Sequence, residues 1–310
     1  MKRLPAIVVA AAMLCLGSIA VAQVTFSGTT WADAFVTTGS SNNPAGSDLT
    51  GLDFGAAGTL VIAPANSGKG EFQSLLKFNF SNAVALFNTN YGAGNWTITG
   101  LSLTLTSNYG TGGVQPNNAV FPKVNGGNFV IEWLADNDWD EGTGTPILPT
   151  TDGVTYDSLP ALLSGPHEIL GTNLYTPPGN NIPATYALPL DPNMVNGIVG
   201  GGDVTFLLYA ADDLIGYLFN SYSYGRGNQP LVNVTAARPL KLISGVFTNG
   251  NFHLTGMGSS DSTYKIQVLT NLGSTNWQAI GTATADDSGA IQFEDTNAAA
   301  QPQRFYRLSQ

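Results

Sequence analysis

The sequence predicts an all-β protein with two antiparallel sandwiches, and three observations support that prediction. Short segments in which apolar and polar residues alternate recur along the chain, and this is the period of a half-buried strand. Clusters of Gly, Asn and Pro separate the segments. No segment shows the longer apolar period of an extended amphipathic helix. We expect a jelly-roll-like antiparallel β-sandwich followed by a small Ig/FnIII-like β-sandwich.

The first 22 residues have the pattern of a signal peptide. Lys2 and Arg3 precede an apolar run from Ile7 to Leu16, and small residues including Ala20 and Ala22 follow it. The apolar run is too short to cross a bilayer as a permanent helix. We expect cleavage near Ala22 and a secreted mature chain, extracellular or on the cell surface, with no membrane span.

Composition excludes several kinds of chemistry and partner. Cys15, the single cysteine, is removed with the signal peptide, so the mature chain has no disulfide and no thiolate site. Loss of Lys2 and Arg3 lowers the basic residues from 11 to 9 against 21 acidic residues, so the mature net charge is 9 − 21 = −12. Because nucleic acid requires a basic surface, we expect no nucleic-acid partner.

The first predicted domain spans residues 23–237. Its clearest alternation runs from Leu101 to Leu105, where every second residue is leucine. Two segments, Ala83–Phe87 and Ser158–Leu163, are each expected to form no more than a helical turn. The expected strands are Leu75–Phe80, Ile98–Leu105, Phe129–Trp133, Thr185–Leu190, Val204–Tyr209 and Leu231–Val234.

The second predicted domain spans residues 238–310, a length that suits a small Ig-like sandwich. It follows a boundary at Ala236–Pro239, and tight-turn sequences such as Asn249–Gly250 separate its strands. The expected strands are Leu240–Phe247, Asn251–Thr255, Tyr264–Leu269, Trp277–Gly281, Ile291–Asp295 and Arg304–Leu308.

Three places in the first domain carry a resemblance to a known family. They are Trp31–Val36, the segment from Glu132–Leu134 to Trp139–Gly142, and the segment from Phe219–Ser221 to Gln229–Val234. These resemble the secreted bacterial β-sandwich modules of the DNRLRE type, which are related to carbohydrate-binding modules. The resemblance implies a sandwich that binds a glycan. This chain departs from the family pattern because Tyr224–Gly227 stands where an Arg-Glu pair usually precedes the closing strand.

The second domain resembles a module found at the C-termini of exported bacterial proteins. The resemblance implies no particular role, and cell-surface display and spacing both remain open. It is carried by Tyr264–Gln267, Asn276–Trp277, Asp286–Gly289, Phe293–Asp295 and Arg304–Arg307.

An acidic loop after the middle strand is a candidate structural calcium site. Alternate carboxylates present the hard oxygen ligands that calcium prefers, and concentrated negative charge favours a cation. The loop is not an EF-hand, because Glu141 stands at the turn-glycine position and Ile147 at that of the bidentate carboxylate. The alternative is a solvated loop with Trp133 or Trp139 packed beneath it. The candidate calcium ligands are Asp136, Asp138, Asp140 and Glu141, and no other cofactor is expected.

Aromatic residues in loops are candidates for stacking on sugar rings, whose apolar faces match a flat side chain. Most tryptophans in a sandwich of this size belong to the core. Tyr222 and Tyr224 are two residues apart, so on a strand both rings would lie on one face. The candidate glycan-binding residues are Trp139, Tyr222 and Tyr224.

The sequence contains no motif that predicts an enzyme. His167 and His253 are the only histidines, and G-x-S-x-G is absent. A glycan-active hydrolase or lyase would use two carboxylates on opposite sides of a sugar, and no spacing pairs the available glutamates in that way. The glutamates considered for such a site are Glu71, Glu132, Glu141 and Glu168.

These features favour a non-catalytic extracellular binding protein that recognises a glycan or a cell-surface polymer. The alternative is a structural or adhesive protein of the cell envelope or matrix, and a hydrolase or lyase is the third possibility. An exposed aromatic row on a sheet face would favour glycan binding. A long exposed strand edge would favour the adhesive role, because such an edge can accept another strand.

Overall fold

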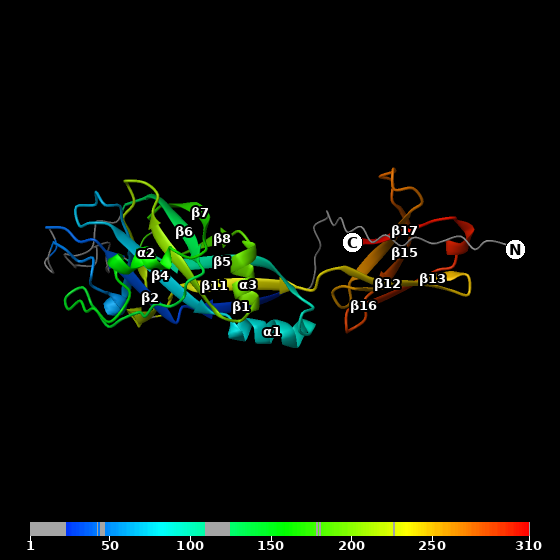
Figure 1. The fold of residues 1–310 in the computed structure, drawn as a ribbon, viewed down its shortest axis with the longest axis horizontal. Helices are drawn as coiled ribbons and strands as arrows, with labels where there is room; N and C mark the ends of the chain where they lie inside the picture. The colour runs from blue at the N-terminus through cyan, green and yellow to red at the C-terminus, as the bar shows by residue number, and fades with distance from the viewer. Residues whose placement is uncertain are drawn as a thin grey trace. The chain divides into compact units, whose positions relative to one another are not determined.

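The computed structural model describes residues 23–309 except residues 42, 44–46, 109–124, 178, 180 and 226, so the predicted signal peptide lies outside the described residues. The protein is 47% strand and 13% helix, with several antiparallel sheets (Figure 1). The predicted all-β sandwich class is therefore confirmed.

The chain divides into two compact units. The larger unit comprises Thr25–Leu86 and Ile98–Thr235. The smaller unit contains the chain from Ala236 onward together with Phe87–Thr97. The division after Thr235 lies two residues before the predicted domain boundary at 237, whereas Phe87–Thr97 belongs to the predicted first domain in sequence but groups with the tail.

The larger unit contains a five-stranded sheet in the order β2-β4-β9-β6-β7, a four-stranded sheet in the order β1-β11-β5-β8, and a two-stranded sheet of β10 and β3 (Figure 1). The six predicted strands of this part of the chain correspond to β4, β5, β6, β8, β9 and β11. The strand bounds are β1 Gln23–Thr29, β2 Ala32–Thr37, β3 Thr59–Ile62, β4 Phe72–Asn79, β5 Thr97–Thr106, β6 Gly127–Leu134, β7 His167–Tyr175, β8 Pro183–Leu188, β9 Asp203–Ala210, β10 Tyr217–Asn220 and β11 Leu231–Ala237.

Aromatic side chains join the sheets of the larger unit. Phe129 of β6 meets the edge of Tyr186 of β8, with ring centroids 5.2 Å apart. Tyr175 of β7 stacks on Tyr217 of β10 at 3.5 Å. Since alternate residues of a strand point to the same face, each strand contributes one apolar row to this interior.

Helices are short, but two differ from the expectation. α1 (Ser81–Tyr91) is an eleven-residue helix where a single turn was expected. α3 (Pro192–Val199) was not expected at all, although Asp191 and Pro192 form a recognisable helix start. The Asp191 carboxylate accepts hydrogen bonds from the N–H groups of Asn193 and Met194. The remaining helical elements are α2 Leu159–Leu162 and the 3-10 turns η1 Gly55–Ala57, η3 Tyr156–Ser158, η4 Tyr222–Tyr224 and η5 Ala298–Ala300.

The smaller unit has two three-stranded sheets, in the orders β12-β13-β16 and β15-β14-β17. All six predicted tail strands are present. Asn249 and Gly250 both have positive φ and form the two-residue turn between β12 and β13, as the Asn-Gly pair predicts. The strand bounds are β12 Lys241–Thr248, β13 Asn251–Met257, β14 Thr263–Leu269, β15 Gln278–Thr284, β16 Ala290–Asp295 and β17 Phe305–Ser309.

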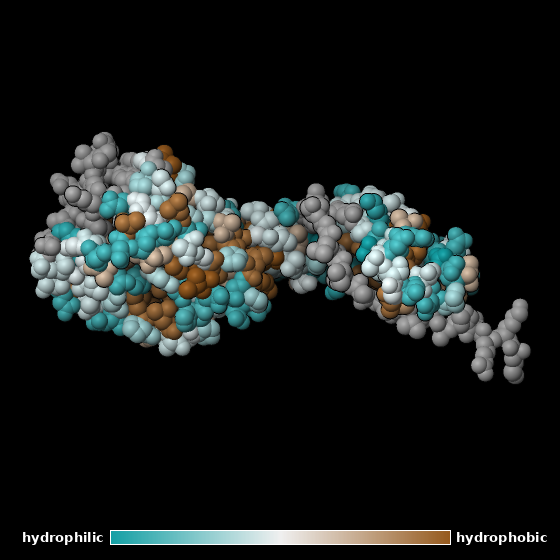
Figure 2. All heavy atoms as spheres, turned by 90° about the horizontal axis from the view of Figure 1, so that it is seen from above, coloured by the Kyte–Doolittle hydropathy of each residue, from teal (hydrophilic) through white to brown (hydrophobic). Residues whose placement is uncertain are grey.

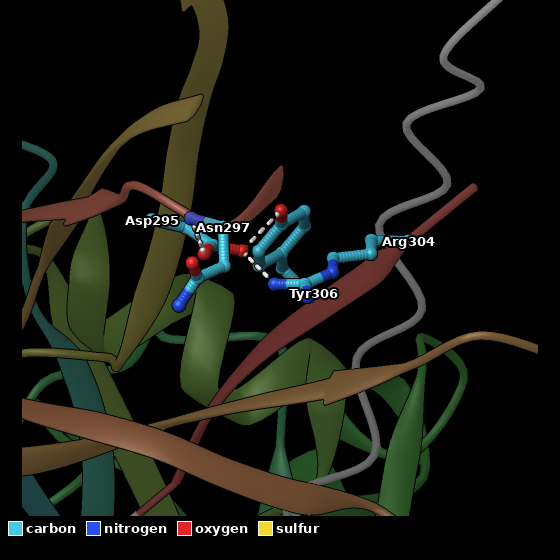
Figure 3. Close-up of polar contacts among 4 residues, drawn as sticks. All are labelled: Asp295, Asn297, Arg304 and Tyr306. Carbon is cyan, nitrogen blue, oxygen red and sulfur yellow. Dashed lines mark hydrogen bonds and ion pairs between the residues drawn. The ribbon is translucent and has the colours of Figure 1, made fainter. Parts of the chain in front are cut away.

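A buried polar cluster fixes the last strand of the smaller unit. Figure 3 shows Arg304 and Tyr306 both directed at the carboxylate of Asp295. The Tyr306 hydroxyl donates to Asp295 Oδ2 at 2.9 Å, and Arg304 forms an ion pair with the same oxygen. The Asn297 N–H donates to Asp295 Oδ1 at 3.0 Å. Because Tyr306 also stacks on Phe252, the cluster joins β17 to β13 and β16.

Candidate functional site

Three strands of the five-stranded sheet bring polar residues to one corner of the larger unit. In the antiparallel register Asn79 of β4 pairs with Asp203 of β9, and Lys77 pairs with Ala32 of β2. Trp31 lies immediately before β2, and its N–H donates to the Lys77 carbonyl at 3.1 Å. The end of β4 and the starts of β2 and β9 therefore meet at this corner.

Asp203 organises the corner. Its Oδ1 accepts a hydrogen bond from Trp31 Nε1 at 3.2 Å and another from Asn79 Nδ2 at 2.8 Å. The Trp31 side chain is nevertheless 49% exposed. Trp31 is thus a tryptophan whose orientation is set by a carboxylate while much of its ring surface faces solvent.

A pocket of about 340 Å³ lies beside Asp203. This volume is at the small end of the range for small-molecule sites. The end of β6, the start of β9 and helix α3 contribute its walls, which combine one indole ring with amide and carboxylate groups. The lining residues are Trp133, Ala135, Asn137, Pro166, Asn193, Gly197, Asp203 and Val204.

Lys77 is a buried cation between two indole rings. Its Nζ lies 5.1 Å from the ring centroid of Trp31 and 4.4 Å from that of Trp139. The same ammonium donates a hydrogen bond to the Trp139 carbonyl at 2.5 Å. Burial lowers the pKa of Lys77, and nearby aspartates oppose that shift. The opposing aspartates are Asp203, Asp140, Asp138 and Asp136.

The acidic loop therefore has a positive partner from the protein itself. Asp136, Asp138 and Asp140 act on Lys77, whereas Glu141 accepts a hydrogen bond from Ser223 Oγ at 3.4 Å. Among the described residues, no three His, Cys, Asp or Glu side chains come together in a way that could hold a metal ion. The four candidate calcium ligands thus do not form a single ligand set here, and calcium in this loop stays a prediction.

The expected aromatic platforms need correction. Trp139 is 7% exposed and its Nε1 donates to Thr205 Oγ1 at 2.9 Å, so the ring is packed beneath the loop and offers no surface platform. Tyr222 and Tyr224 lie on the 3-10 turn η4 and not on a strand, so their two-residue spacing does not place them on one face. Tyr222 is 45% exposed. Trp31 was assigned to the core by sequence reasoning and is the exposed tryptophan instead.

A buried carboxylate fastens the chain that follows the acidic loop. Asp53 accepts hydrogen bonds from Gly144 N–H at 2.9 Å, Thr150 Oγ1 at 2.6 Å and Asp152 N–H at 3.2 Å. Gly142 has φ +79° and approaches Asp53 so closely that a Cβ would collide with the carboxylate. The loop that covers Lys77 is consequently held at its C-terminal side.

The glutamates considered for hydrolysis have separate partners. Glu71 accepts from the Tyr156 hydroxyl at 2.8 Å, and Glu132 Oε1 lies 2.5 Å from His167 Nδ1. Burial and the charge of Glu132 raise the pKa of Tyr209 to about 12. Glu168 is exposed on β7. The contacts of these groups are therefore with tyrosine, histidine and serine.

No family model matches this chain, and no curated protein shows significant similarity to it. Within the described part of the chain, helices are too short and too polar to cross a membrane. The fold and the corner at Asp203 together define the class as an all-β sandwich protein with a small pocket beside an exposed tryptophan.

Proposed function

We propose that this protein is a non-catalytic, secreted extracellular binding protein that recognises a glycan at the pocket beside Asp203. The observation that carries the proposal is the combination of Trp31, exposed and oriented by Asp203, with a pocket that Asp203 also lines. An indole ring can stack on the apolar face of a sugar ring, while amides and carboxylates bond its hydroxyls. The exposed Asn193 on α3 provides such an amide at the pocket wall.

The charges around the pocket favour a neutral glycan. Asp203, Asp140, Asp138 and Asp136 act on Lys77, so the local formal charge is 1 − 4 = −3. A sugar carboxylate or sulfate would meet this negative field without a free cation to pair with it. A neutral polysaccharide avoids that repulsion.

The test is binding of the mature full chain to matched neutral and uronate-containing polysaccharides. Trp31→Ala and Asn193→Ala are each expected to weaken binding to a neutral polymer at least about tenfold, which corresponds to about 1.4 kcal/mol. Tyr222→Ala is the matched control, because it removes another exposed aromatic ring that does not line the pocket. Absence of binding to every polymer, or loss only in the Tyr222 variant, would contradict the proposal.

A second candidate is the adhesive role, and one observation favours it. β7 is a nine-residue strand at the end of the five-stranded sheet, and its Leu174 is 67% exposed. Figure 2 shows apolar patches on one face of the larger unit. Such an edge can accept a strand from another chain. Leu174→Lys should abolish any concentration-dependent self-association measured by sedimentation, and a wild-type chain that remains monomeric at high concentration would count against self-association through this edge.

A further inference from the structure

A second buried polar cluster in the larger unit lies where β2, η1, the acidic loop and η4 converge, and its residues are not among those that line the pocket. Its centre is Asp33 of β2, which is fully buried. Asp33 Oδ2 accepts hydrogen bonds from Tyr222 N–H at 2.7 Å and from Thr30 Oγ1 at 3.2 Å. The other oxygen, Oδ1, is buried and has no hydrogen-bond partner among the described residues.

A second buried oxygen is in the same situation. Ser221 directly precedes Tyr222, the residue whose N–H binds Asp33, and Ser221 is buried. Its Oγ likewise has no hydrogen-bond partner in the described chain. A buried polar atom without a partner costs about 1–3 kcal/mol, and such atoms in native proteins commonly face a bound water or ion.

Glu141 brings a second carboxylate to this place. Its charge acts on Asp33 and, after burial, is the next influence that raises the pKa of Asp33, so the two carboxyl groups are close. Ser223 Oγ holds Glu141 Oε1 at 3.4 Å. Gly55 allows the approach, because a Cβ at Gly55 would overlap the Glu141 backbone. The cluster thus gathers two carboxylates and a free hydroxyl.

Hydrogen bonding between the two carboxyl groups does not account for their closeness, since none joins Asp33 to Glu141 side chain to side chain among the described contacts. A hard cation would account for it. Calcium binds oxygens at about 2.3–2.6 Å, so two oxygens on the same ion can lie up to about 5 Å apart without touching. Two carboxylates would also neutralise its double charge.

We propose that Asp33 Oδ1, the Glu141 carboxylate and Ser221 Oγ bind a calcium ion. The ion supplies a partner to both buried oxygens and removes the repulsion between the carboxylates. It would join β2 to η4 and to the acidic loop. The site differs from the loop set Asp136, Asp138 and Asp140, whose charges act on Lys77.

The experiment measures thermal unfolding of the mature full chain in EDTA, in CaCl₂ and in MgCl₂, with calorimetric titration of calcium. Calcium at about 100 times its dissociation constant should raise the melting temperature by about 5–10 °C and bind with one-to-one stoichiometry. Asp33→Asn keeps the shape and the acceptor for Tyr222 N–H but removes the charge, so the calcium-dependent rise should disappear. Asp138→Asn is the matched control, which should retain the rise.

Glu141→Gln serves as a second variant, because Glu141 is only half-buried and its amide can keep the Ser223 contact. It should weaken calcium binding at least tenfold if Asp33→Asn fails to fold. Three results would overturn the proposal. They are a wild-type chain that calcium neither binds nor stabilises, Asp33 and Glu141 variants that keep the rise, or loss of the rise in Asp138→Asn alone, which would place the ion in the loop.

Discussion

The ammonium group of Lys77 lies 4.4 Å from the centre of the Trp139 ring and donates a hydrogen bond to the carbonyl of the same residue. This relationship explains why Trp139 is buried in a loop rich in aspartate. The indole covers the cation, and the aspartates Asp136, Asp138 and Asp140 surround it with the opposite charge. An acidic sequence that suggests a metal ligand set thus has a lysine from a distant strand as its partner.

Lys77→Met tests this arrangement. Methionine keeps most of the side-chain volume but removes the charge, the cation–π contacts and the hydrogen bond to Trp139. The aspartates would then repel one another, so we expect a loss of about 2–3 kcal/mol in the free energy of unfolding, measured with urea. Lys241→Met on the exposed surface of β12 is the control and should change stability by less than about 0.5 kcal/mol. Equal effects of the two substitutions would contradict the role given to Lys77.

Asp33 predicts a pH dependence of stability in the absence of divalent metal. Burial, followed by the charge of Glu141, raises the pKa of Asp33 from 3.8 to about 8. The folded chain therefore holds a proton that the unfolded chain has released between about pH 4 and pH 8, so this group makes stability fall as pH rises through that window. In EDTA, Asp33→Asn should become more stable than wild type as pH increases from 4 to 8. A stability difference that stays constant over this range in urea titrations would be inconsistent with the buried carboxyl.

Asp295→Ala tests the polar cluster of the smaller unit. Removal of the carboxylate leaves Arg304 buried without its ion pair and takes the acceptor from the Tyr306 hydroxyl. We expect a loss of about 3–5 kcal/mol in that unit, detected as faster hydrogen exchange in β16 and β17. Asp287→Ala, at an exposed turn residue, is the control. Unchanged exchange in β17 after Asp295→Ala would show that the cluster does not fix the strand.

Asp191→Ala tests the helix that forms one wall of the pocket. The carboxylate caps α3 by accepting from Asn193 and Met194 N–H, and loss of such a cap costs about 1 kcal/mol. Because Asn193 is in the first turn of α3, the substitution should also weaken glycan binding, by less than Asn193→Ala does. Urea unfolding and polysaccharide binding measure the two effects separately. Asp213→Ala, an exposed aspartate outside the helix, should change neither.

Strands with their own alternation could be predicted from sequence, and the others could not. All six tail strands and the pattern Leu101–Leu105 in β5 follow from the period-two burial of one sheet face. β7 was missed because its burial does not alternate regularly, with Ile169 and Leu174 exposed at a sheet edge. β2 was reached only through a family resemblance, because all six of its residues are buried and both of its faces are covered.

Sequence alone determined the all-β class, the two-residue turn at Asn249–Gly250 and the acidic character of the loop, because these depend on local pattern and composition. Tertiary structure decided which tryptophan is exposed and which charges meet. Trp31 and Asp203 are 172 residues apart, and Lys77 and Trp139 are 62 apart. Strand register brings them together, and register depends on the packing of whole sheets, which no local pattern specifies. The pocket and the partner of the acidic loop are therefore properties of the folded chain.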